Sequence, residues 1–234
     1  MIYNLIVIGA GGTGTYFLKE VSRQISSDKS IQKKLSSLFI VDGDMVESKN
    51  LERQCFTSDD IGRNKAIVMA EVLNETFDLQ WKALPEYFTT QKRLKEICET
   101  DSNAVPVIIG CVDNHACRLL CEQYFNASNN CIYFDAANEF ATGECVYAYR
   151  IKDTLIGPPR SFYFPEIKEG DLRNVTEISC QELNAVLPQH IYTNMSSGLC
   201  LLSGFNNLMD GRLTPGVIYF NSQKLQMEFI PFFK

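Results

Sequence analysis

The sequence predicts an α/β fold: a Rossmann-like, mainly parallel sheet with helices on both faces, extended by a C-terminal crossover helix and β-hairpin. Two observations favour this fold. Short apolar runs alternate with amphipathic helical patterns up to about residue 135, which is typical of parallel strands joined by right-handed crossovers. The first apolar run also ends in a glycine-rich turn that opens a helical pattern, the order found in nucleotide-binding folds.

The elements of the first region follow in that alternating order. Apolar runs predict strands, and apolar side chains at helical spacing predict helices. The expected strands cover 2–8, 38–41, 79–84, 105–111, 131–134 and 145–149. The expected helices follow the glycine turn and cover 65–77, 90–99 and 114–125. We therefore expect a nucleotide-binding, Rossmann-like region over residues 1–150.

The remainder, 151–234, has a different character. Prolines and a charged stretch predict a long loop or lid over 157–179. Helical spacing then predicts a crossover helix over 193–209, and two short strands, 217–220 and 225–230, read as a hairpin. We expect these elements to complete the same domain.

The composition narrows the class of protein. The 234 residues are 21% charged and 45% hydrophobic, as in ordinary globular domains. There are 22 Lys and Arg against 28 Asp and Glu, a net charge of −6, so neither nucleic acid nor a membrane is an expected partner. Nine cysteines without a Cys-x-x-Cys pair argue against a disulfide scaffold or a four-cysteine zinc site. No secretory leader or membrane span is predicted, so we expect a cytoplasmic protein.

The glycine turn has the G-x-G-x-x-G spacing of a phosphate-binding loop. Its glycines are Gly9, Gly11, Gly12 and Gly14. The first allows a tight turn, the second lets a phosphate or sugar approach the backbone, and the last lets the helix pack close to the strand. The helix N-terminus then offers free N–H groups to an anion. The turn predicts a nucleotide site; a glycine turn without a ligand is the alternative.

Asp42 ends the second apolar run. A carboxylate at the end of the second strand can accept hydrogen bonds from both ribose hydroxyls. Capping of the following turn is the alternative role for this aspartate. The glycine turn and Asp42 together fit NAD and ATP equally well.

Polar residues beyond the second strand distinguish these two nucleotides. Asn50, Arg53 and Gln54 lie in a long polar connection, and Lys65 begins a helical pattern. Hydride transfer needs no cations beside the phosphates, whereas adenylyl transfer does, because negative charge builds up on the α-phosphate and on the departing pyrophosphate. Arginine binds phosphate oxygens through two hydrogen bonds, and lysine supplies a point charge. Together these residues favour ATP over NAD. The alternative is that Arg53 and Lys65 are solvated surface cations.

Asp113 follows another buried run and precedes a helical pattern. Its carboxylate would stand at the C-terminal edge of the sheet, where open α/β folds bind ligands. One carboxylate, with phosphates and water, is a suitable ligand set for Mg²⁺. N-capping of the helix by the pair Asp113 and Asn114 is the alternative.

Five segments together resemble the ThiF/MoeB/ubiquitin-activating enzyme superfamily in their order and spacing. They are 9–14, 42–46, 50–54, 61–66 and 111–114. Later segments resemble the ThiF-like proteins of PRTRC gene clusters, namely 134–138, 142–143, 164–166, 179–180 and 216–221. The resemblance implies an adenylyltransferase that uses ATP and Mg²⁺ to activate the C-terminal glycine carboxylate of a ubiquitin-like or sulfur-carrier protein. It also implies a homodimer.

The resemblance further implies roles for the matching residues. The four glycines and Asp42 would hold adenosine, with Asp44 nearby. The residues implied to contact the phosphates and stabilise the transition state are Asn50, Arg53 and Lys65. Asp113 would hold Mg²⁺, and Gln54 matches the motif without a role of its own.

Cys180 matches the position of a thioester or persulfide cysteine in several relatives. A small buried apolar side chain is the alternative reading of this cysteine. Two other functions stay open for the whole chain. A scaffold that binds nucleotide without adenylation is one, because family members carry an arginine ahead of the first strand and here we expect that strand to begin at Ile2. An NAD-dependent oxidoreductase is the other.

Overall fold

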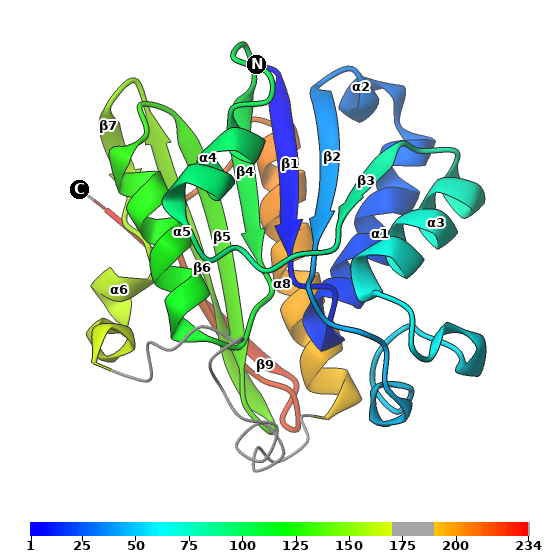
Figure 1. Cartoon of the computed structure of the whole chain (residues 1–234). Coiled ribbons are helices and arrows are strands. Elements are labelled where there is room, and N and C mark those ends of the chain that lie inside the picture. Colours follow the sequence, from blue (N-terminus) through cyan, green and yellow to red (C-terminus); the bar gives the residue numbers. More distant parts are fainter. Residues whose placement is uncertain (170–189, 234) are drawn as a thin grey trace.

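A computed structural model describes residues 1–169 and 190–233 of the chain. Nine strands form one sheet in the order β3-β2-β1-β4-β5-β6-β8-β9, with β7 paired to β6 (Figure 1). The first five strands along the chain pair in parallel. They are β1 (Tyr3–Ile8), β2 (Leu35–Val41), β3 (Trp81–Leu84), β4 (Val105–Gly110) and β5 (Cys131–Asn138). The predicted α/β fold is confirmed.

The other strands extend the sheet in antiparallel pairing. They are β6 (Thr142–Ile151), β7 (Thr154–Gly157), β8 (Gly216–Asn221) and β9 (Gln226–Pro231). The last two form the predicted C-terminal hairpin, which joins the sheet through β8 and leaves β9 at its edge.

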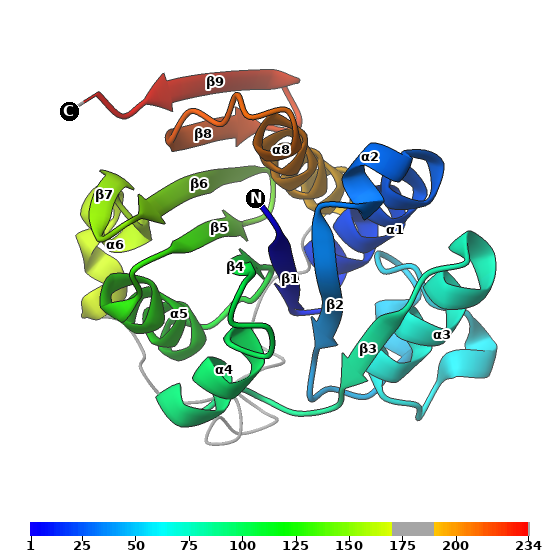
Figure 2. The ribbon, with the colours of Figure 1, turned by 90° about the horizontal axis from the view of Figure 1, so that it is seen from above.

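Helices cover both faces of the sheet (Figures 1 and 2). One core packs against α1 (Gly12–Ser27), α3 (Lys65–Phe77) and α8 (Ile191–Met209), and the other against α4 (Gln91–Cys98) and α5 (His115–Ala127). The parallel strands feed both cores because alternate side chains point to opposite faces; Leu5 belongs to the first core and Ile6 to the second. This double burial explains why these strands read as continuous apolar runs.

Trp81 ties β3 to helix α1. The indole is 4% exposed, and its Nε1 donates to the Ser22 hydroxyl at 2.9 Å. An indole N–H buried in a core needs such a partner. This bond therefore fixes the middle of α1 against the edge of the parallel strands.

The sequence pattern missed some elements and shortened others. The expected loop over 157–179 holds two short helices in the part that the structure describes, α6 (Arg160–Tyr163) and η3 (Pro165–Lys168). The residues from 170 onward in that loop lie outside the described part. The pattern also missed β7 and the short helices α2 (Lys29–Gln32), η1 (Ser48–Asn50) and η2 (Ser58–Asp60).

Strand β5 continues past the expected end at 134. Its last residues are small or polar, so hydropathy alone does not mark them as strand. Pairing with β6 as far as Asn138 opposite Gly143 carries the extended backbone onward. This extension brings Asn138 to the glycine turn, where its side-chain oxygen accepts from the Thr13 hydroxyl at 3.2 Å.

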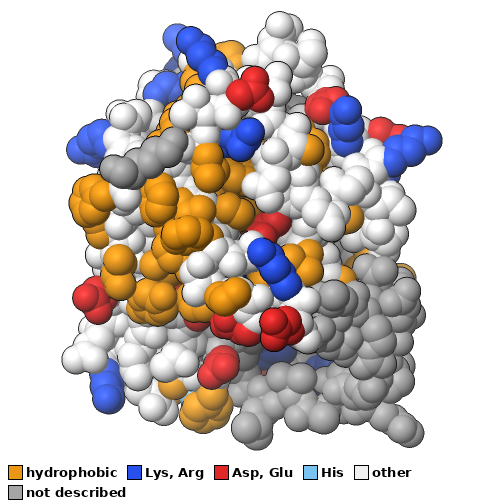
Figure 3. Space-filling model, turned by 90° about the vertical axis from the view of Figure 1, so that its left-hand side faces the viewer, with side chains coloured by type: hydrophobic (Ala, Val, Ile, Leu, Met, Phe, Trp, Pro, Cys, Tyr) orange, Lys and Arg blue, Asp and Glu red, His pale blue; other side chains and the backbone are white. Residues whose placement is uncertain are grey.

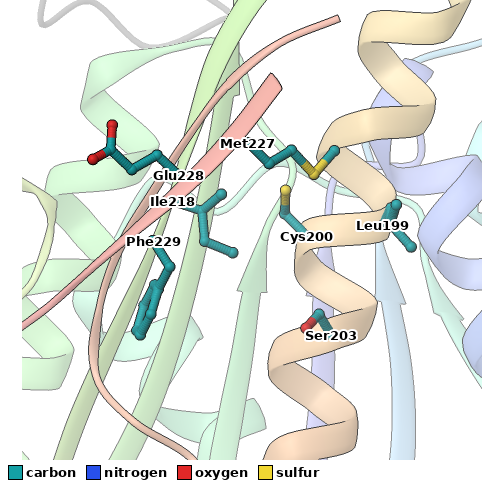
Figure 4. Close-up of a pocket in the computed structure, with 7 residues that line it drawn as sticks. All are labelled: Leu199, Cys200, Ser203, Ile218, Met227, Glu228 and Phe229. Carbon is teal, nitrogen blue, oxygen red and sulfur yellow. The ribbon is translucent and has the colours of Figure 1, made fainter. Parts of the chain in front are cut away.

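Hydrophobic side chains gather on one side of the molecule (Figure 3). The edge strand β9 contributes to the exposed apolar surface with Met227, Phe229 and Ile230. Between α8 and the hairpin lies a cavity of about 380 Å³ with mostly apolar walls (Figure 4). Within the described residues, no helix is long and apolar enough to cross a membrane.

Candidate nucleotide site

The carboxyl ends of β1, β2 and β4 lie at one edge of the sheet (Figure 1). The glycine turn, the Asp42 segment and the Asp113 segment each leave the sheet at that edge. Ligands of open parallel sheets bind outside these strand ends. The topology therefore gathers three of the predicted site segments.

Three of the four glycines have neighbours that exclude a β-carbon, namely backbone at Gly9 and Gly14 and the Asn194 side chain at Gly12. Gly9 has a φ of +98°, and a β-carbon there would lie 2.6 Å from the carbonyl oxygen of Cys111. A β-carbon at Gly14 would overlap the carbonyl oxygen of Gly9. A larger residue at either position would disturb the turn from β1 into α1.

Gly11 differs, because no neighbouring atom in the described protein excludes a β-carbon there. Its φ is −85°, and the nearest atom to a β-carbon at this position is Gln54 Nε2 at 3.8 Å. Gly11 is also the N-cap of α1, which has no side-chain cap and no acidic residue in its first turn. An open backbone and an uncapped helix N-terminus fit a phosphate or sugar approaching from outside.

Asp42 fastens the glycine turn to the end of β2. Its Oδ2 accepts from the Ala10 N–H at 2.6 Å, and its Oδ1 accepts from the Asp44 N–H at 2.8 Å. Each oxygen keeps a further lone pair with which to accept from a ribose hydroxyl. Burial raises the pKa of Asp42 to about 6, although the nearby charge of Lys65 opposes the shift.

Lys65 begins α3 with a buried amine held by Asp44. The Lys65 Nζ lies 2.8 Å from Asp44 Oδ2, and the Tyr87 hydroxyl donates to the other Asp44 oxygen. Burial alone would raise the pKa of Asp44, but the Lys65 charge and these hydrogen bonds lower it overall. The Lys65 amine, which we expected at the phosphates, therefore lies against the Asp44 carboxylate, and this bond uses one of its three N–H donors.

Asn64 positions that lysine. Its Oδ1 caps α3 by accepting from the Ala66 N–H at 2.9 Å, while its Nδ2 donates to the carbonyl oxygens of Asp42 and Asp44 at 2.9 and 3.0 Å. A cap that also binds the neighbouring turn fixes the helix start relative to it. Lys65 is thereby held at the same edge as Asp42.

The polar connection after β2 folds back onto the glycine turn. Asn50 is 4% exposed, and its Oδ1 accepts from the Glu47 N–H at 2.9 Å, so this side chain shapes the connection. Arg53 lies half-buried in the turn after η1. Gln54 is buried beside Gly11, and its Oε1 has no partner in the described part of the chain. A buried amide oxygen without a donor is a position where a ligand or water would bind.

Asp113 lies exposed in the segment between β4 and α5. Asn114 caps α5 through the Cys117 N–H at 2.8 Å, so the cap does not need Asp113. Burial, the hydrogen bond to Asp44 and the negative charges of Asp44, Asp42 and Asp113 raise the pKa of the Tyr87 hydroxyl.

An oxygen donor at Asp113 fits Mg²⁺ in chemical type. The described residues contain no group of three or more His, Cys, Asp or Glu side chains that could hold a metal by themselves. A magnesium ion here would therefore take most of its ligands from phosphates and water.

Sequence reasoning missed two features of the site. Tyr87 follows β3 in an irregular segment with no motif to mark it. Arg118 supports the Asp113 segment by donating to the Val112 carbonyl oxygen at 2.6 Å, and it shares the buried Asp135 carboxylate with Arg160. No motif in the sequence marks this cluster, which stands out in the structure because both arginines are buried. Cys180 lies outside the described residues.

The sheet order and the glycine turn define a Rossmann-like α/β protein. The model of the ThiF family matches residues 3–154. The chain therefore belongs to the ThiF family. No curated protein matches the chain by sequence.

Solved structures share this fold at low sequence identity. PaaA matches with a TM-score of 0.69 and 13% identity, over 99% of this chain and 64% of PaaA. MccB from E. coli with succinimide matches with a TM-score of 0.69 and 15% identity, over 98% of this chain and 63% of MccB. MccB with ATP matches with a TM-score of 0.67 and 14% identity over the same shares. The chain thus spans slightly less than two thirds of the length of these proteins.

Proposed function

We propose that the chain is an ATP- and Mg²⁺-dependent adenylyltransferase of the ThiF type. In this proposal it activates the C-terminal glycine carboxylate of a ubiquitin-like or sulfur-carrier protein and releases pyrophosphate. One observation carries the proposal: the family match over 3–154 contains each proposed nucleotide-site residue from Gly9 to Asp113. The solved complexes of MccB with ATP, and with N-formylated MccA, support binding of a nucleotide and a second molecule on this fold.

The adenosine half would lie across the glycine turn. Gly9, Gly12 and Gly14 shape the turn, and Gly11 leaves the backbone open to the ligand. Asp42 would accept from the ribose hydroxyls while it keeps its bonds to Ala10 and Asp44. The positive end of α1 would face the phosphates.

The phosphates would lie toward Arg53, Lys65 and Asp113. In the reaction, an oxygen of the acceptor carboxylate attacks the α-phosphorus, the bond from that phosphorus to the bridging oxygen breaks, and pyrophosphate leaves with the electron pair. The carboxylate is already ionised, so no side-chain base is required, and positioning and charge neutralisation carry the catalysis.

Each side chain has a distinct part in this proposal. Arg53 and the free donors of Lys65 would bind phosphate oxygens, and Asn50 would hold the connection that presents Arg53. Mg²⁺, when bound, neutralises phosphate charge, and Asp113 would supply its protein ligand. Cys180 is proposed as the carrier cysteine, whose thiolate would attack the acyl carbonyl of the adenylate and form a thioester as AMP leaves.

The remaining parts of the proposal concern the setting of the protein. We expect the protein to be cytoplasmic and homodimeric. Within the family, we expect it to be most similar to the ThiF-like proteins of PRTRC gene clusters. Support for an assembly comes from the exposed apolar side chains of the edge strand, because patches of that kind mark interaction surfaces.

ATP–pyrophosphate exchange tests the proposed reaction. Purified protein, Mg²⁺ and a glycine-terminated carrier protein should exchange labelled pyrophosphate into ATP. A carrier lacking its terminal glycine is the control and should give no exchange. ATP binding without exchange would favour the scaffold, and binding of NAD in place of ATP would favour the oxidoreductase.

A further inference from the structure

Helices α1 and α8 run side by side, and both begin at the edge of the sheet that carries the nucleotide site (Figures 1 and 2). Asn194 lies against Gly12 near the two N-termini, and Asn206 accepts from Gln24 near the two C-termini. The two contacts are twelve residues apart on each helix, so the helices are parallel and in register. The seam between them therefore leads directly to the glycine turn.

Asn194 fills the space beside Gly12, the first residue of α1. Its side chain is fully buried, and its Oδ1 lies 2.6 Å from where a β-carbon on Gly12 would be. The same Oδ1 accepts from Asn138 Nδ2 at 3.2 Å, and Asn138 Oδ1 accepts from the Thr13 hydroxyl at 3.2 Å. This chain of hydrogen bonds joins the first turn of α1 to the end of β5 and the start of α8.

The same corner offers hydrogen-bond donors at the start of both helices. Asn194 Nδ2 is buried and has no acceptor in the parts of the chain that the structure describes. Neither α1 nor α8 has a side-chain cap or an acidic residue in its first turn. Two helix N-termini and an unpaired amide donor each contribute positive potential at this corner.

We propose that Asn194 is a positioning residue for phosphate binding. It braces the first turn of α1 through its contact with Gly12 and, by way of Asn138, through Thr13, and as a neutral amide it adds no negative charge there. This inference rests on the proposed function, since it assumes that the N-terminal end of α1 faces the phosphates of ATP. Asn194 would act through the turn and would not touch the reacting atoms.

Asn194→Asp tests the inference, because aspartate has nearly the same shape and can still accept from Asn138 while adding one negative charge. At pH 8.5, where the new carboxyl is ionised beside two helix N-termini, we expect ATP affinity to fall at least about tenfold. Adenosine has no phosphate, so its affinity should stay within about twofold. Calorimetry measures both, and circular dichroism checks the fold.

Asn206→Asp is the matched control. It makes the same chemical change in the same seam, about 18 Å further along the helix, and should leave both affinities unchanged. Equal ATP affinity in Asn194→Asp and wild type would overturn the inference, as would equal losses of ATP and adenosine. If the wild type binds neither ligand, the proposed function itself fails.

A smaller substitution covers the case in which Asn194→Asp does not fold. Asn194→Ser removes the brace without adding charge, and Asn206→Ser is its control. ATP affinity should fall several-fold in Asn194→Ser, with adenosine affinity retained. Wild-type ATP affinity in the folded serine variant would show that Asn194 only fills the seam.

Discussion

At the scale of single residues, Asp42 combines two tasks in one carboxylate. It holds two backbone N–H groups and is proposed to accept from ribose. Burial raises its pKa to about 6, so it is a carboxylate at neutral pH and takes up a proton under mildly acidic conditions. Its proposed binding role is consequently sensitive to pH in an accessible range.

Adenosine affinity should therefore depend on pH. Above about 6 the carboxylate is ionised and the affinity should be constant. As the pH falls below that value the affinity should decrease, approaching about tenfold per pH unit if binding requires the ionised form. Calorimetric titrations of adenosine from pH 5 to 8 measure this, and adenosine avoids the titration of phosphates. Asp42→Asn removes the titrating carboxyl, so this variant should bind adenosine weakly and with no such pH dependence. If the pH dependence persists in Asp42→Asn, another group must cause it.

Lys65 gives a second residue-scale prediction. Lys65→Ala should lower the pyrophosphate-exchange rate about 10²–10³-fold, because it removes a phosphate donor. Melting temperature must be measured in parallel, since the buried amine also neutralises Asp44. Tyr87→Phe is the control, because it removes one hydrogen bond from Asp44 and keeps the lysine. Exchange at the wild-type rate in folded Lys65→Ala would refute the phosphate role.

The sequence predicts some of these residues and misses others for a physical reason. Asp42 and Lys65 stand at the end of a strand and the start of a helix, and such positions can be read from local hydropathy. Tyr87 and Asn194 act on Asp44 and Gly12 from distant parts of the chain. Such long-range contacts leave no local pattern.

At the scale of elements, the turn from β1 into α1 contains glycines of two kinds. Gly14 is needed because the carbonyl oxygen of Gly9 occupies the position of a β-carbon, whereas a β-carbon at Gly11 would meet only Gln54 Nε2, at 3.8 Å. The G-x-G-x-x-G spacing alone does not separate these reasons, because it records only the residue type. The structure separates them, and the difference can be measured.

Alanine at Gly14 should lower mainly the stability of the fold, whereas alanine at Gly11 should weaken mainly ATP binding. Gly14→Ala should lower the free energy of unfolding by about 1–3 kcal/mol, because it forces the turn apart. Gly11→Ala should change that free energy by less than about 1 kcal/mol, yet weaken ATP binding, because its methyl group enters the proposed ligand space. Urea unfolding and calorimetry measure the two quantities. Normal ATP affinity in Gly11→Ala would place the nucleotide elsewhere.

At the scale of the whole molecule, the sequence predicts the parallel strands of the sheet well and the antiparallel strands less well. Strands buried on both faces give apolar runs, which local hydropathy detects. The position of β8 beside β6 depends on pairing between segments separated by α8, and such pairing has no local signature. The same limit hid β7 and the extension of β5.

Ligand binding should stabilise the whole domain. At a concentration one hundred times its dissociation constant, Mg-ATP should add about 2.7 kcal/mol to the stability. For a chain of this size that corresponds to a rise in melting temperature of about 5–10 °C. Differential scanning fluorimetry would measure the shift, and NAD at the same concentration should give none. A shift with NAD and not with Mg-ATP would contradict the proposed function.

The bond between Trp81 and Ser22 provides an internal optical probe. The chain has one tryptophan, so all of its tryptophan fluorescence comes from the Trp81 indole. That indole is held in the interior by the helix that starts at the glycine turn. Any tilt of the helix when a nucleotide arrives, or its detachment during denaturation, would alter the emission spectrum without a dye.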